Sequence, residues 1–330
     1  MPTDSVPAAA PRAFVLGNFV LACCWQVARL PRAGETLQAR GFHSEPGGKG
    51  LNVAVGLQRL GVAVDTLIGC GSDAAAEQLF ALLARERLAT RHVHRLAGPS
   101  GWGAGLIAAE GANAIAVHLG ANQLLTAAHA QAARAEIEAA QLVYGQFETS
   151  LASVEGAFTL AHAAGVPTLL NPSPWQPPTA VLRRGTHTVL VNQVEAAELL
   201  GLDALPTADA RARVGDALAG FGRAWPSAQR LVVTLGADGA LGAQRDAQGG
   251  WQLMSSPAAA ITAVDTVGAG DAFAAGYAAA LLAGRPLAEA LRWGNCCAGE
   301  VAARAGVLAA LPDARRLRAL LQALPAATSA

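Results

Sequence analysis

The chain has 330 residues, enough for one large domain or two smaller ones, with a core that needs no disulfide bonds. Hydrophobic residues make up 52 % of the chain, and its 24 basic residues balance its 24 acidic ones, so the formal net charge is zero. This composition excludes a largely disordered protein. It also argues against a nucleic-acid-binding or polybasic membrane-binding protein, because both classes need an excess of positive charge.

The cysteines and the amino-terminal segment predict a cytoplasmic protein. The cysteines are Cys23, Cys24, Cys70, Cys296 and Cys297. They form no C-x-x-C or other zinc-binding spacing, so we expect them to be reduced. Residues 1–12 lack the basic and apolar regions of a secretory signal, and we expect them, like residues 326–330, to be flexible. No run of about 18 uncharged apolar residues predicts a membrane span.

Short apolar runs alternate with segments of helical periodicity along most of the chain. Strands are predicted at residues 13–20, 62–68, 141–144, 167–170, 187–191 and 230–234. Helices are predicted at residues 51–60, 74–88, 126–140, 151–164, 194–200, 211–221, 269–283, 287–303 and 314–324. Asp73 is the expected N-cap of the second helix, and Gly201 the expected end of the fifth. This alternation predicts βαβ units, with a mostly parallel sheet covered by helices on both faces.

Two segments, residues 27–43 and 102–118, interrupt this alternation with short extended pieces and glycine turns. Such strands, with no helix between them, do not easily join a parallel sheet. We expect them to form a small β-sheet outside the core, as a lid over its edge. Exposed sheet edges are a liability unless they are covered, so we expect a homodimer joined through the lids.

The strongest local signal is the heptapeptide Asp265–Asp271, D-T-V-G-A-G-D, which leads into an alanine-rich helix. Glycines where a loop becomes a helix let backbone N–H groups approach a ligand, and the helix dipole adds positive potential. This combination suits a phosphate group. A carboxylate in the first turn, here Asp271, would repel a phosphate that is merely bound. It is typical of a base that deprotonates a hydroxyl attacking phosphorus, although an N-cap on an ordinary glycine turn is an alternative.

A second glycine-rich segment, Gly47–Asn52, has the sequence G-G-K-G-L-N and also opens a predicted helix. It is similar to the end of a P-loop, but Gly50 follows Lys49 where a P-loop has the Ser or Thr that holds Mg²⁺. No G-x-G-x-x-G follows a predicted strand, so a Rossmann oxidoreductase is disfavoured.

Together these segments resemble the ribokinase-like, or pfkB, family of carbohydrate kinases, and the resemblance spans residues 13–312. Three weaker motifs in the same order support it: N-P-S-P at 171–174, N-Q-V-E at 192–195 and T-L-G-A-D-G at 234–239. The family implies a three-layer α-β-α core over residues 13–325, with a mostly parallel central sheet and lid segments near 21–45 and 98–120. It also implies Mg²⁺-dependent transfer of a phosphoryl group from ATP to a sugar hydroxymethyl group.

The resemblance implies a role for residues at matching positions. Asp271 would be the general base, and the N–H groups of Gly268, Ala269 and Gly270 would hold the developing charge. The acceptor would be bound by Gly47, Gly48, Lys49, Asn52 and Glu148. ATP would be bound by Asn192, Glu195, Thr234, Gly236, Gly239 and Asn295, with Glu195 reaching Mg²⁺ through water. A monovalent cation such as K⁺ would be held by Asp265, Val267, Val301, Arg304 and Gly306, although Ala310 stands where ribokinases supply a Ser oxygen.

The first predicted strand departs from the family pattern. Where ribokinases bind sugar hydroxyls with Asn and, two residues later, Asp, this chain has Val20 and Ala22. Losing hydrogen bonds to a substrate hydroxyl changes discrimination strongly, so ribose is a doubtful substrate. Trp102 and His118 on the lid are candidates for new contacts. A nucleoside kinase and a non-catalytic sugar-binding relative remain alternatives to a sugar kinase.

Overall fold

The computed structural model of the chain describes residues 10–108 and 112–323. The expected flexible tail at 326–330 and residues 1–9 of the expected flexible amino terminus lie outside the described residues. Arg12, the last residue of that amino-terminal segment, already begins the first strand.

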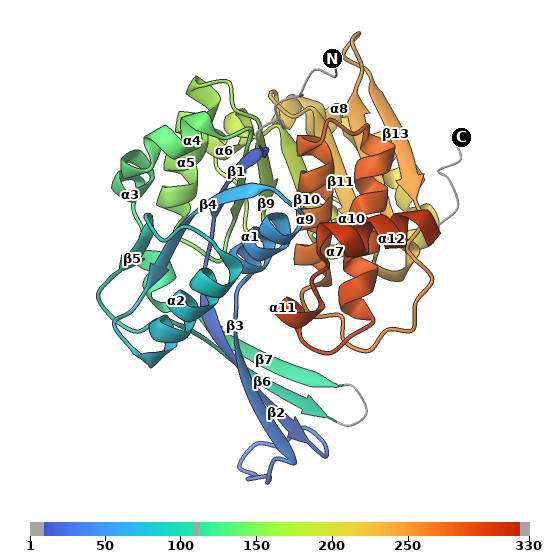
Figure 1. The fold of residues 1–330 in the computed structure, drawn as a ribbon. Coiled ribbons are helices and arrows are strands. Elements are labelled where there is room, and N and C mark those ends of the chain that lie inside the picture. Colours follow the sequence, from blue (N-terminus) through green and yellow to red (C-terminus); the bar gives the residue numbers. More distant parts are fainter. Residues whose placement is uncertain (1–9, 109–111, 324–330) are drawn as a thin grey trace, which may run out of the picture.

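A nine-stranded sheet forms the centre of the molecule (Figure 1). In spatial order its strands are β13 (Trp251–Ser256), β12 (Ala240–Arg245), β11 (Arg230–Thr234), β10 (Thr188–Asn192), β9 (Thr168–Asn171), β8 (Leu142–Gln146), β1 (Arg12–Leu16), β4 (Ala63–Cys70) and β5 (Val93–Arg95). β12 runs antiparallel to β11 and β13, and the remaining neighbours are parallel. The sheet is therefore mostly parallel, as the alternation of strands and helices predicts.

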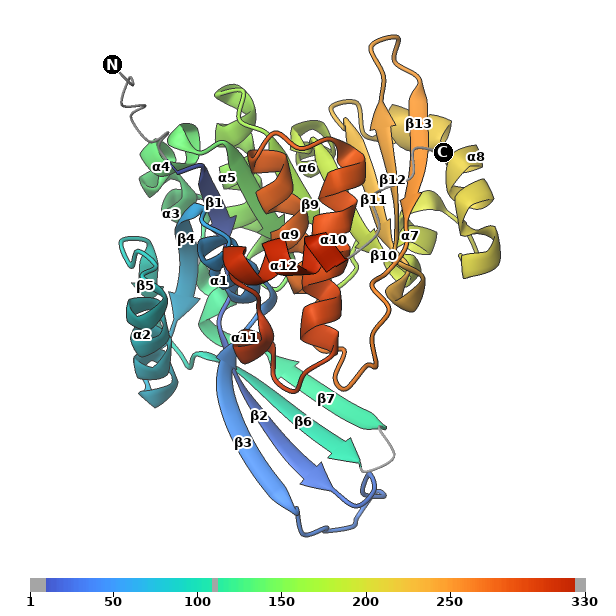
Figure 2. The same ribbon diagram turned by 45° about the vertical axis from the view of Figure 1, so that its right-hand side comes forward.

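Helices cover both faces of this sheet (Figure 2). One layer contains α1 (Lys49–Arg59), α2 (Ala74–Glu86), α9 (Ala269–Leu282), α10 (Leu287–Ala302), α11 (Val307–Ala310) and α12 (Ala314–Ala323). The other contains α3 (Ala127–Ala132), α4 (Arg134–Ala139), α5 (Leu151–Ala163), α6 (Ala180–Gly185), α7 (Gln193–Leu200) and α8 (Ala210–Ala224). Side chains alternate along each strand, so Ala13 and Val15 of β1 pack in the first core and Phe14 and Leu16 in the second. The expected three-layer fold is confirmed.

Several predicted helix ends are also confirmed. The Asp73 side chain accepts a hydrogen bond from the N–H of Ala76 and caps α2. Gly201 adopts the left-handed conformation that ends α7. The predicted helix at 126–140 is wrong in one respect, because it is two short helices that meet at Ala133.

The prediction missed four elements, β12, β13, α6 and α11. The β12–β13 hairpin lies at the edge of the sheet, where one strand needs only one partner. Its sequence contains neither a long apolar run nor strict alternation.

The predicted strand at 13–20 is wrong, because the chain changes sheet within it. β1 ends at Leu16, and a new strand, β2 (Val20–Val27), begins after three residues. The backbone N–H groups of this link find hydrogen-bond acceptors in distant segments. The N–H of Gly17 donates to the Leu67 carbonyl at 2.9 Å, and the N–H of Phe19 donates to Asn122 Oδ1 at 2.8 Å. A mostly apolar run cannot reveal partners that lie so far away in the sequence.

A four-stranded sheet projects from one edge of the core and is here called the lid (Figures 1 and 2). Its strands, in spatial order, are β3 (Gly41–Gly47), β2, β6 (Gly101–Ala108) and β7 (Asn113–His118). β2 is antiparallel to β3 and parallel to β6, and β6 is antiparallel to β7. The extended piece predicted at 27–43 is placed too late, since residues 28–40 contain no strand.

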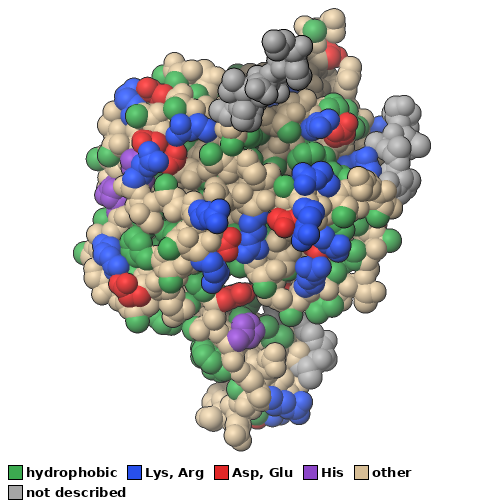
Figure 3. Space-filling model, viewed as in Figure 1, with side chains coloured by type: hydrophobic (Ala, Val, Ile, Leu, Met, Phe, Trp, Pro, Cys, Tyr) green, Lys and Arg blue, Asp and Glu red, His purple; other side chains and the backbone are tan. Residues whose placement is uncertain are grey.

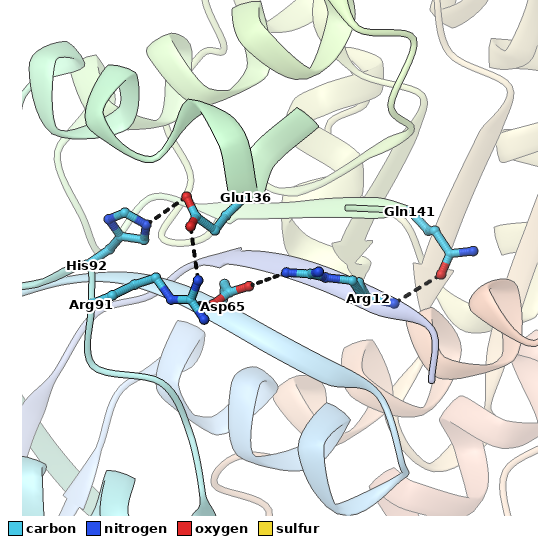
Figure 4. A network of polar contacts seen from close by, with 6 residues as sticks. All are labelled: Arg12, Asp65, Arg91, His92, Glu136 and Gln141. Atoms are coloured by element: carbon cyan, nitrogen blue, oxygen red, sulfur yellow. Dashed lines mark hydrogen bonds and ion pairs between the residues drawn. The ribbon is translucent and has the colours of Figure 1, made fainter. Parts of the chain in front are cut away.

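A charged network lies at the amino ends of the central strands (Figure 4). Asp65 of β4 forms ion pairs with Arg12 of β1 at 3.2 Å and with Arg91 at 3.3 Å. Glu136 of α4 is hydrogen-bonded to the side chains of Arg91 and His92, each at 3.0 Å. This network joins two strands, a helix and the turn before β5 at the end of the sheet opposite the site described below. The nearby His94 is a packing residue, since its ring lies against that of His129.

Charged side chains gather over the C-terminal helices in the view of Figure 3, and few lie on the lid. Among the described residues, none of the helices is both long enough and apolar enough to cross a membrane.

Candidate active site

A small pocket lies where the carboxyl ends of β9, β10 and β11 meet the start of α9. Ligand sites in open α/β sheets lie at this edge. Its lining residues are Lys49, Asn171, Ser173, Leu190, Val191, Asn192, Glu195, Thr234, Gly270 and Asp271. The pocket lining therefore includes residues from all five motifs that the sequence analysis describes.

Asp271 lies in the first turn of α9 and is only 7 % exposed. Burial raises the pKa of its carboxyl group to about 6, and the charge of Glu148 adds to this effect. The positive charge of Lys49 and a 2.8 Å hydrogen bond from Asn52 Nδ2 oppose it. A carboxylate with a pKa in this range is ionised at neutral pH and can still take up a proton there.

Lys49 is the partly buried first residue of α1. Burial by itself lowers the pKa of its amine, but the negative charges of Asp271, Glu148 and Glu195 outweigh burial, so the pKa is raised. The amine therefore stays positively charged, and it balances part of the negative charge of three carboxylates around the pocket.

Asn52 has one unsatisfied polar atom beside the catalytic candidate. Its side chain is 5 % exposed, and its amide nitrogen is committed to Asp271. Its oxygen, Oδ1, is buried without a hydrogen-bond partner among the described residues. A buried acceptor left without a donor is unfavourable, and a hydroxyl group of a bound ligand would satisfy it.

Glu148 is oriented by a buried amide, Asn18, that the sequence analysis did not single out. Asn18 Nδ2 donates to Glu148 Oε2 at 2.9 Å, and Asn18 Oδ1 accepts from the N–H of Gly50 at 2.8 Å. Gln146 Nε2 also donates to Asn18 Oδ1, at 3.2 Å, and its own oxygen accepts from the N–H of Glu148. A lone Asn inside an apolar run, directly after Gly17, was the only available signal.

Gly48 lies tightly against Asn18, which explains why this position is a glycine. Its φ of 121° is unfavourable for other residues, and a Cβ here would lie 2.8 Å from Asn18 Nδ2. The turn at Gly47 and Gly48 thus brings the start of α1 against Asn18 and, through it, against Glu148. The N–H of Lys49 lies 3.4 Å from Glu148 Oε2.

The start of α9, where the sequence predicts an anion site, is a glycine turn. Gly268 adopts the left-handed conformation at φ 75°, and its carbonyl accepts the N–H of Ala272 at 2.9 Å. A Cβ at Gly270 would meet nothing within 4 Å, so the first turn faces open space there. The N–H of Ala269 points to the carbonyl of Thr266 at 3.3 Å, and this long hydrogen bond would compete with a ligand for that amide.

Asn192 and Glu195 form a capping box at the start of α7. The Asn192 side chain accepts the N–H of Glu195 at 2.9 Å, and Glu195 Oε2 accepts the N–H of Asn192 at 3.0 Å. Thr234 is the register partner of Asn192 on the neighbouring strand. The N-x-x-E motif thus has a structural role, and it also holds the buried Glu195 carboxylate at the pocket wall.

Three other residues predicted to bind the nucleotide lie outside the pocket lining. Gly236, at φ 60°, has open space around it. Gly239, at φ 95°, packs so closely that a Cβ would overlap the carbonyl oxygen of Ser256. Asn295 Nδ2 donates to the backbone oxygens of Ser256 and Pro257, each at 3.0 Å. Gly239 and Asn295 therefore also fix the chain segment that follows β13.

The residues predicted to hold a monovalent cation come from two segments that touch. The N–H of Val264 donates to the Ala302 carbonyl at 2.7 Å, which brings the segment containing Asp265 and Val267 beside the end of α10. The remaining candidates, Val301, Arg304 and Gly306, follow along that end. Asp265 Oδ1 accepts the N–H of Val267 at 3.0 Å. A carboxylate and carbonyl oxygens suit a hard cation, although no cluster of three or more His, Cys, Asp or Glu occurs in the part of the chain that the structure describes.

The lid candidates Trp102 and His118 are wrong as contacts to this site. They are cross-strand partners on the lid face that also carries Trp25 and Phe42. The opposite face carries Glu45, whose carboxylate accepts the N–H of Val307 at 3.3 Å and therefore faces the core.

Comparisons with known proteins agree on one family. Residues 12–314 match the sequence model of the pfkB family carbohydrate kinases. The chain is 30 % identical to a ribokinase of Schizosaccharomyces pombe over 307 residues, which cover 91 % of this chain and 94 % of that one. It is also 30 % identical to a ribokinase of Bacillus subtilis over 291 residues, covering 88 % and 92 %. The structure of an Arabidopsis thaliana ribokinase complexed with ribose and ATP is similar in fold, with a TM-score of 0.83, 23 % identity and coverage of 95 % and 99 %.

The packing around the 234–239 loop predicts unequal effects of two glycine substitutions. Gly239→Ala should lower the free energy of unfolding by several kcal/mol, because the backbone of Ser256 and Ala258 must move and the φ is positive. Gly236→Ala meets only the conformational penalty of about 1–2 kcal/mol. Urea unfolding of both variants checks this, and equal midpoints would contradict the close packing at Gly239.

Proposed function

The chain belongs to the pfkB family of carbohydrate kinases and is thus a phosphotransferase with an alcohol group as acceptor, and from this membership we propose that it transfers the γ-phosphoryl group of ATP to a sugar hydroxymethyl group. The observation that carries the proposal is the buried Asp271 carboxylate. It lies in the first turn of α9 and is hydrogen-bonded to Asn52. A protein that only bound a sugar would have no use for a base beside a phosphate site.

Asp271 acts as the general base in this proposal. The acceptor hydroxyl gives its proton to the Asp271 carboxylate as its oxygen forms a bond to the γ-phosphorus. The bond from that phosphorus to the bridging oxygen breaks, and ADP leaves. A pKa of about 6 leaves the carboxylate ionised at neutral pH and still basic enough to share the proton.

The start of α9 would stabilise the charge on the transferred group. The N–H groups of Gly268, Ala269 and Gly270 lie at the positive end of the helix dipole. Preorganised donors of this kind act on charge that develops in the transition state. The Lys49 amine adds a full positive charge close to Asp271.

The nucleotide would lie along the carboxyl ends of β10 and β11. Asn192, Glu195 and Thr234 would contact its phosphates, and the loop that carries Gly236 and Gly239, with Asn295, would border the base and ribose. Mg²⁺, when bound, would neutralise phosphate charge, and the buried Glu195 carboxylate is suited to hold it through water. A monovalent cation would be held by Asp265 with the backbone carbonyls of Val267, Val301, Arg304 and Gly306.

The acceptor would lie between the start of α1 and the lid. Gly47, Gly48 and Lys49 form its border, and Asn52 Oδ1 would accept one of its hydroxyl groups. Glu148, oriented by Asn18, would accept another. We place this enzyme in the cytoplasm, where ATP is available and where its five free cysteines would stay reduced.

A homodimer joined through the lids is part of the proposal. The lid face turned away from Glu45 carries large apolar side chains around a hollow of about 530 Å³. Phe42 is 58 % exposed and Trp102 is 41 % exposed, and Trp25 packs against Phe42 at a ring distance of 5.2 Å. An apolar patch of this kind favours burial against a second copy.

Replacing the base should abolish most turnover without affecting nucleotide binding. Asp271→Asn should lower kcat by about 10²–10⁴-fold, because the amide cannot accept the proton. The dissociation constant for ATP, measured by calorimetry, should change little. Asp203→Asn, which removes an exposed carboxylate on another loop, is the matched control. Full turnover in Asp271→Asn would refute the assignment of the base.

The pH profile should report the same carboxylate. Only the ionised form of Asp271 is a base, so kcat/KM should fall about tenfold per pH unit below its pKa of about 6. Lys49→Met removes the charge that lowers this pKa, so the acid limb should move to higher pH. A limb that stays in place in the Lys49→Met variant would point to another titrating group.

The dimer has a direct test in solution. Sedimentation at micromolar concentration should give the mass of two chains for the wild-type protein. The double variant Phe42→Glu, Trp102→Glu should give the mass of one chain, because dimerisation would bury its two new charges without partners. Exposed Val194→Glu on α7 is the control that should remain dimeric. A wild-type protein that sediments only as a monomer would remove the hypothesis.

A further inference from the structure

The lid face toward the core has a floor of small residues, here called the lid trough. The strand register places Ala22 of β2 beside Gly103 of β6, and Cys24 beside Gly105. These four residues point to one face, because a Cβ built at Gly105 would lie 3.5 Å from the Cys24 sulfur. Burial raises the pKa of the Cys24 thiol, so the floor is uncharged at neutral pH.

Larger side chains stand on both sides of this floor. His43 and Glu45 of β3 are the register partners of Cys24 and Ala22. On the other side, β7 contributes Ile115, which is 58 % exposed, and Val117, which is 49 % exposed. The two outer strands are three strand spacings apart, about 14 Å. The result is a wide trough with one polar wall and one apolar wall.

The two floor glycines are not required by packing within the lid. A Cβ at Gly103 would lie 3.7 Å from the nearest atom, the Ala22 Cα, which is an ordinary contact. Neither glycine has a positive φ. Gly101 on the same strand differs, because a Cβ there would overlap the carbonyl of Phe19. Glycine weakens a strand interior, and it commonly marks a place where a ligand approaches the backbone closely.

The trough is continuous with the acceptor end of the active site. Val20, the residue before the floor on β2, pairs with Gly47, which precedes Lys49 by two positions. Glu45 on the trough wall reaches the start of α11 through the N–H of Val307. At the core end lies the buried Asn52 Oδ1, which has no partner among the described residues and thus marks a missing donor.

Apart from His43 and Glu45 on one wall of the trough, the polar contacts available to an acceptor are on the core side. Glu148, held by Asn18, and the amide oxygen of Asn52 can accept hydroxyl groups there. On the lid side, Ala22, Cys24, Gly103 and Gly105 offer no charged or hydroxyl group. A free sugar carries hydroxyl groups around its whole ring, and those facing the trough would lose water without gaining a partner.

We propose that the acceptor is a nucleoside, with its hydroxymethyl-bearing sugar against the core and its flat heterocyclic base in the lid trough. The proposal rests on the kinase function proposed above. The faces of the base would lie on the bare strand backbone at Gly103 and Gly105 and against Ile115 and Val117. Its polar edge would face His43 on the opposite wall. Gly103 and Gly105 are thus specificity-determining residues, because any larger side chain would fill the space of the base.

A comparison of acceptors is the first test. ADP release should be measured with ATP and Mg²⁺, with and without K⁺, on adenosine, inosine, uridine and cytidine and on free ribose, deoxyribose and fructose. We expect kcat/KM for at least one nucleoside to exceed that for every free sugar by about tenfold or more. Binding of the preferred nucleoside without ATP, measured by equilibrium dialysis, should give the same ranking.

Filling the floor is the second test. Gly105→Val introduces a side chain into the trough, with a residue that favours strands. It should raise KM and the dissociation constant for the nucleoside by about 10–200-fold and leave those for free ribose within about threefold. Ala114→Val is the matched control, because Ala114 is exposed on the other face of the lid. Thermal unfolding and ADP binding of both variants check that the fold is intact.

The outcomes separate the two proposals. No transfer to any acceptor would overturn the kinase function and the nucleoside assignment with it. Transfer to a free sugar in preference to every nucleoside would overturn the nucleoside assignment alone. Nucleoside preference that Gly105→Val leaves unchanged would show that the base lies elsewhere, and it too would overturn the role of the trough.

Discussion

The site depends on one carboxylate, Asp271, which is buried at the start of a helix, hydrogen-bonded to Asn52 and stabilised by the charge of Lys49 in the same pocket. Burial raises the pKa of Asp271, while Lys49 and Asn52 hold it near 6. Without Lys49, the buried charge would be more costly, and the acid would be protonated at higher pH. Both partners come from the first turn of α1, so the turn at Gly47 and Gly48 must place α1 against α9. Small residues line the contact between α1 and α9, and a Cβ at Gly56 of α1 would lie only 2.7 Å from Ala275 of α9.

At the site, a hydrogen-bonded edge of the core adjoins a lid surface whose floor consists of small residues. Asn18 connects the link between β1 and β2 to Gly50 of α1 and to Glu148 after β8. Buried polar groups must be paired, so this cluster makes the core side of the site rigid. The lid begins two residues after Asn18, at Val20, and the floor of its inward face carries small residues instead, beside the polar His43 and Glu45 of β3. Strand β2 thus passes from a hydrogen-bonded cluster to a floor that has no charged or hydroxyl side chains.

The order of elements could be predicted because the alternation of apolar runs and helical segments is local. The glycine turns at Gly268 and before Lys49 could be predicted too, since special backbone conformations need glycine. The β12–β13 hairpin was missed, because an edge strand is stabilised by one neighbour that local patterning does not reveal. Asn18 and Gln146 were missed because an amide inside an apolar run has no meaning until its partners are known. Gly239 was assigned to nucleotide binding alone, although Ser256 packs against it.

By itself the sequence determined the family, the three-layer architecture, the element order and the residue types of the proposed chemistry, because these depend on periodicity and on motifs a few residues long. It also showed that Val20 and Ala22 could not bind sugar hydroxyls. Only the tertiary structure decided that Asn52 donates to Asp271 in a pocket that Lys49 also lines, and that Gly103 and Gly105 lie beside Ala22 and Cys24 on one face. Those relations join residues more than 75 positions apart. They follow from strand register and helix packing, in which a shift of one residue would turn every side chain of a strand to the opposite face.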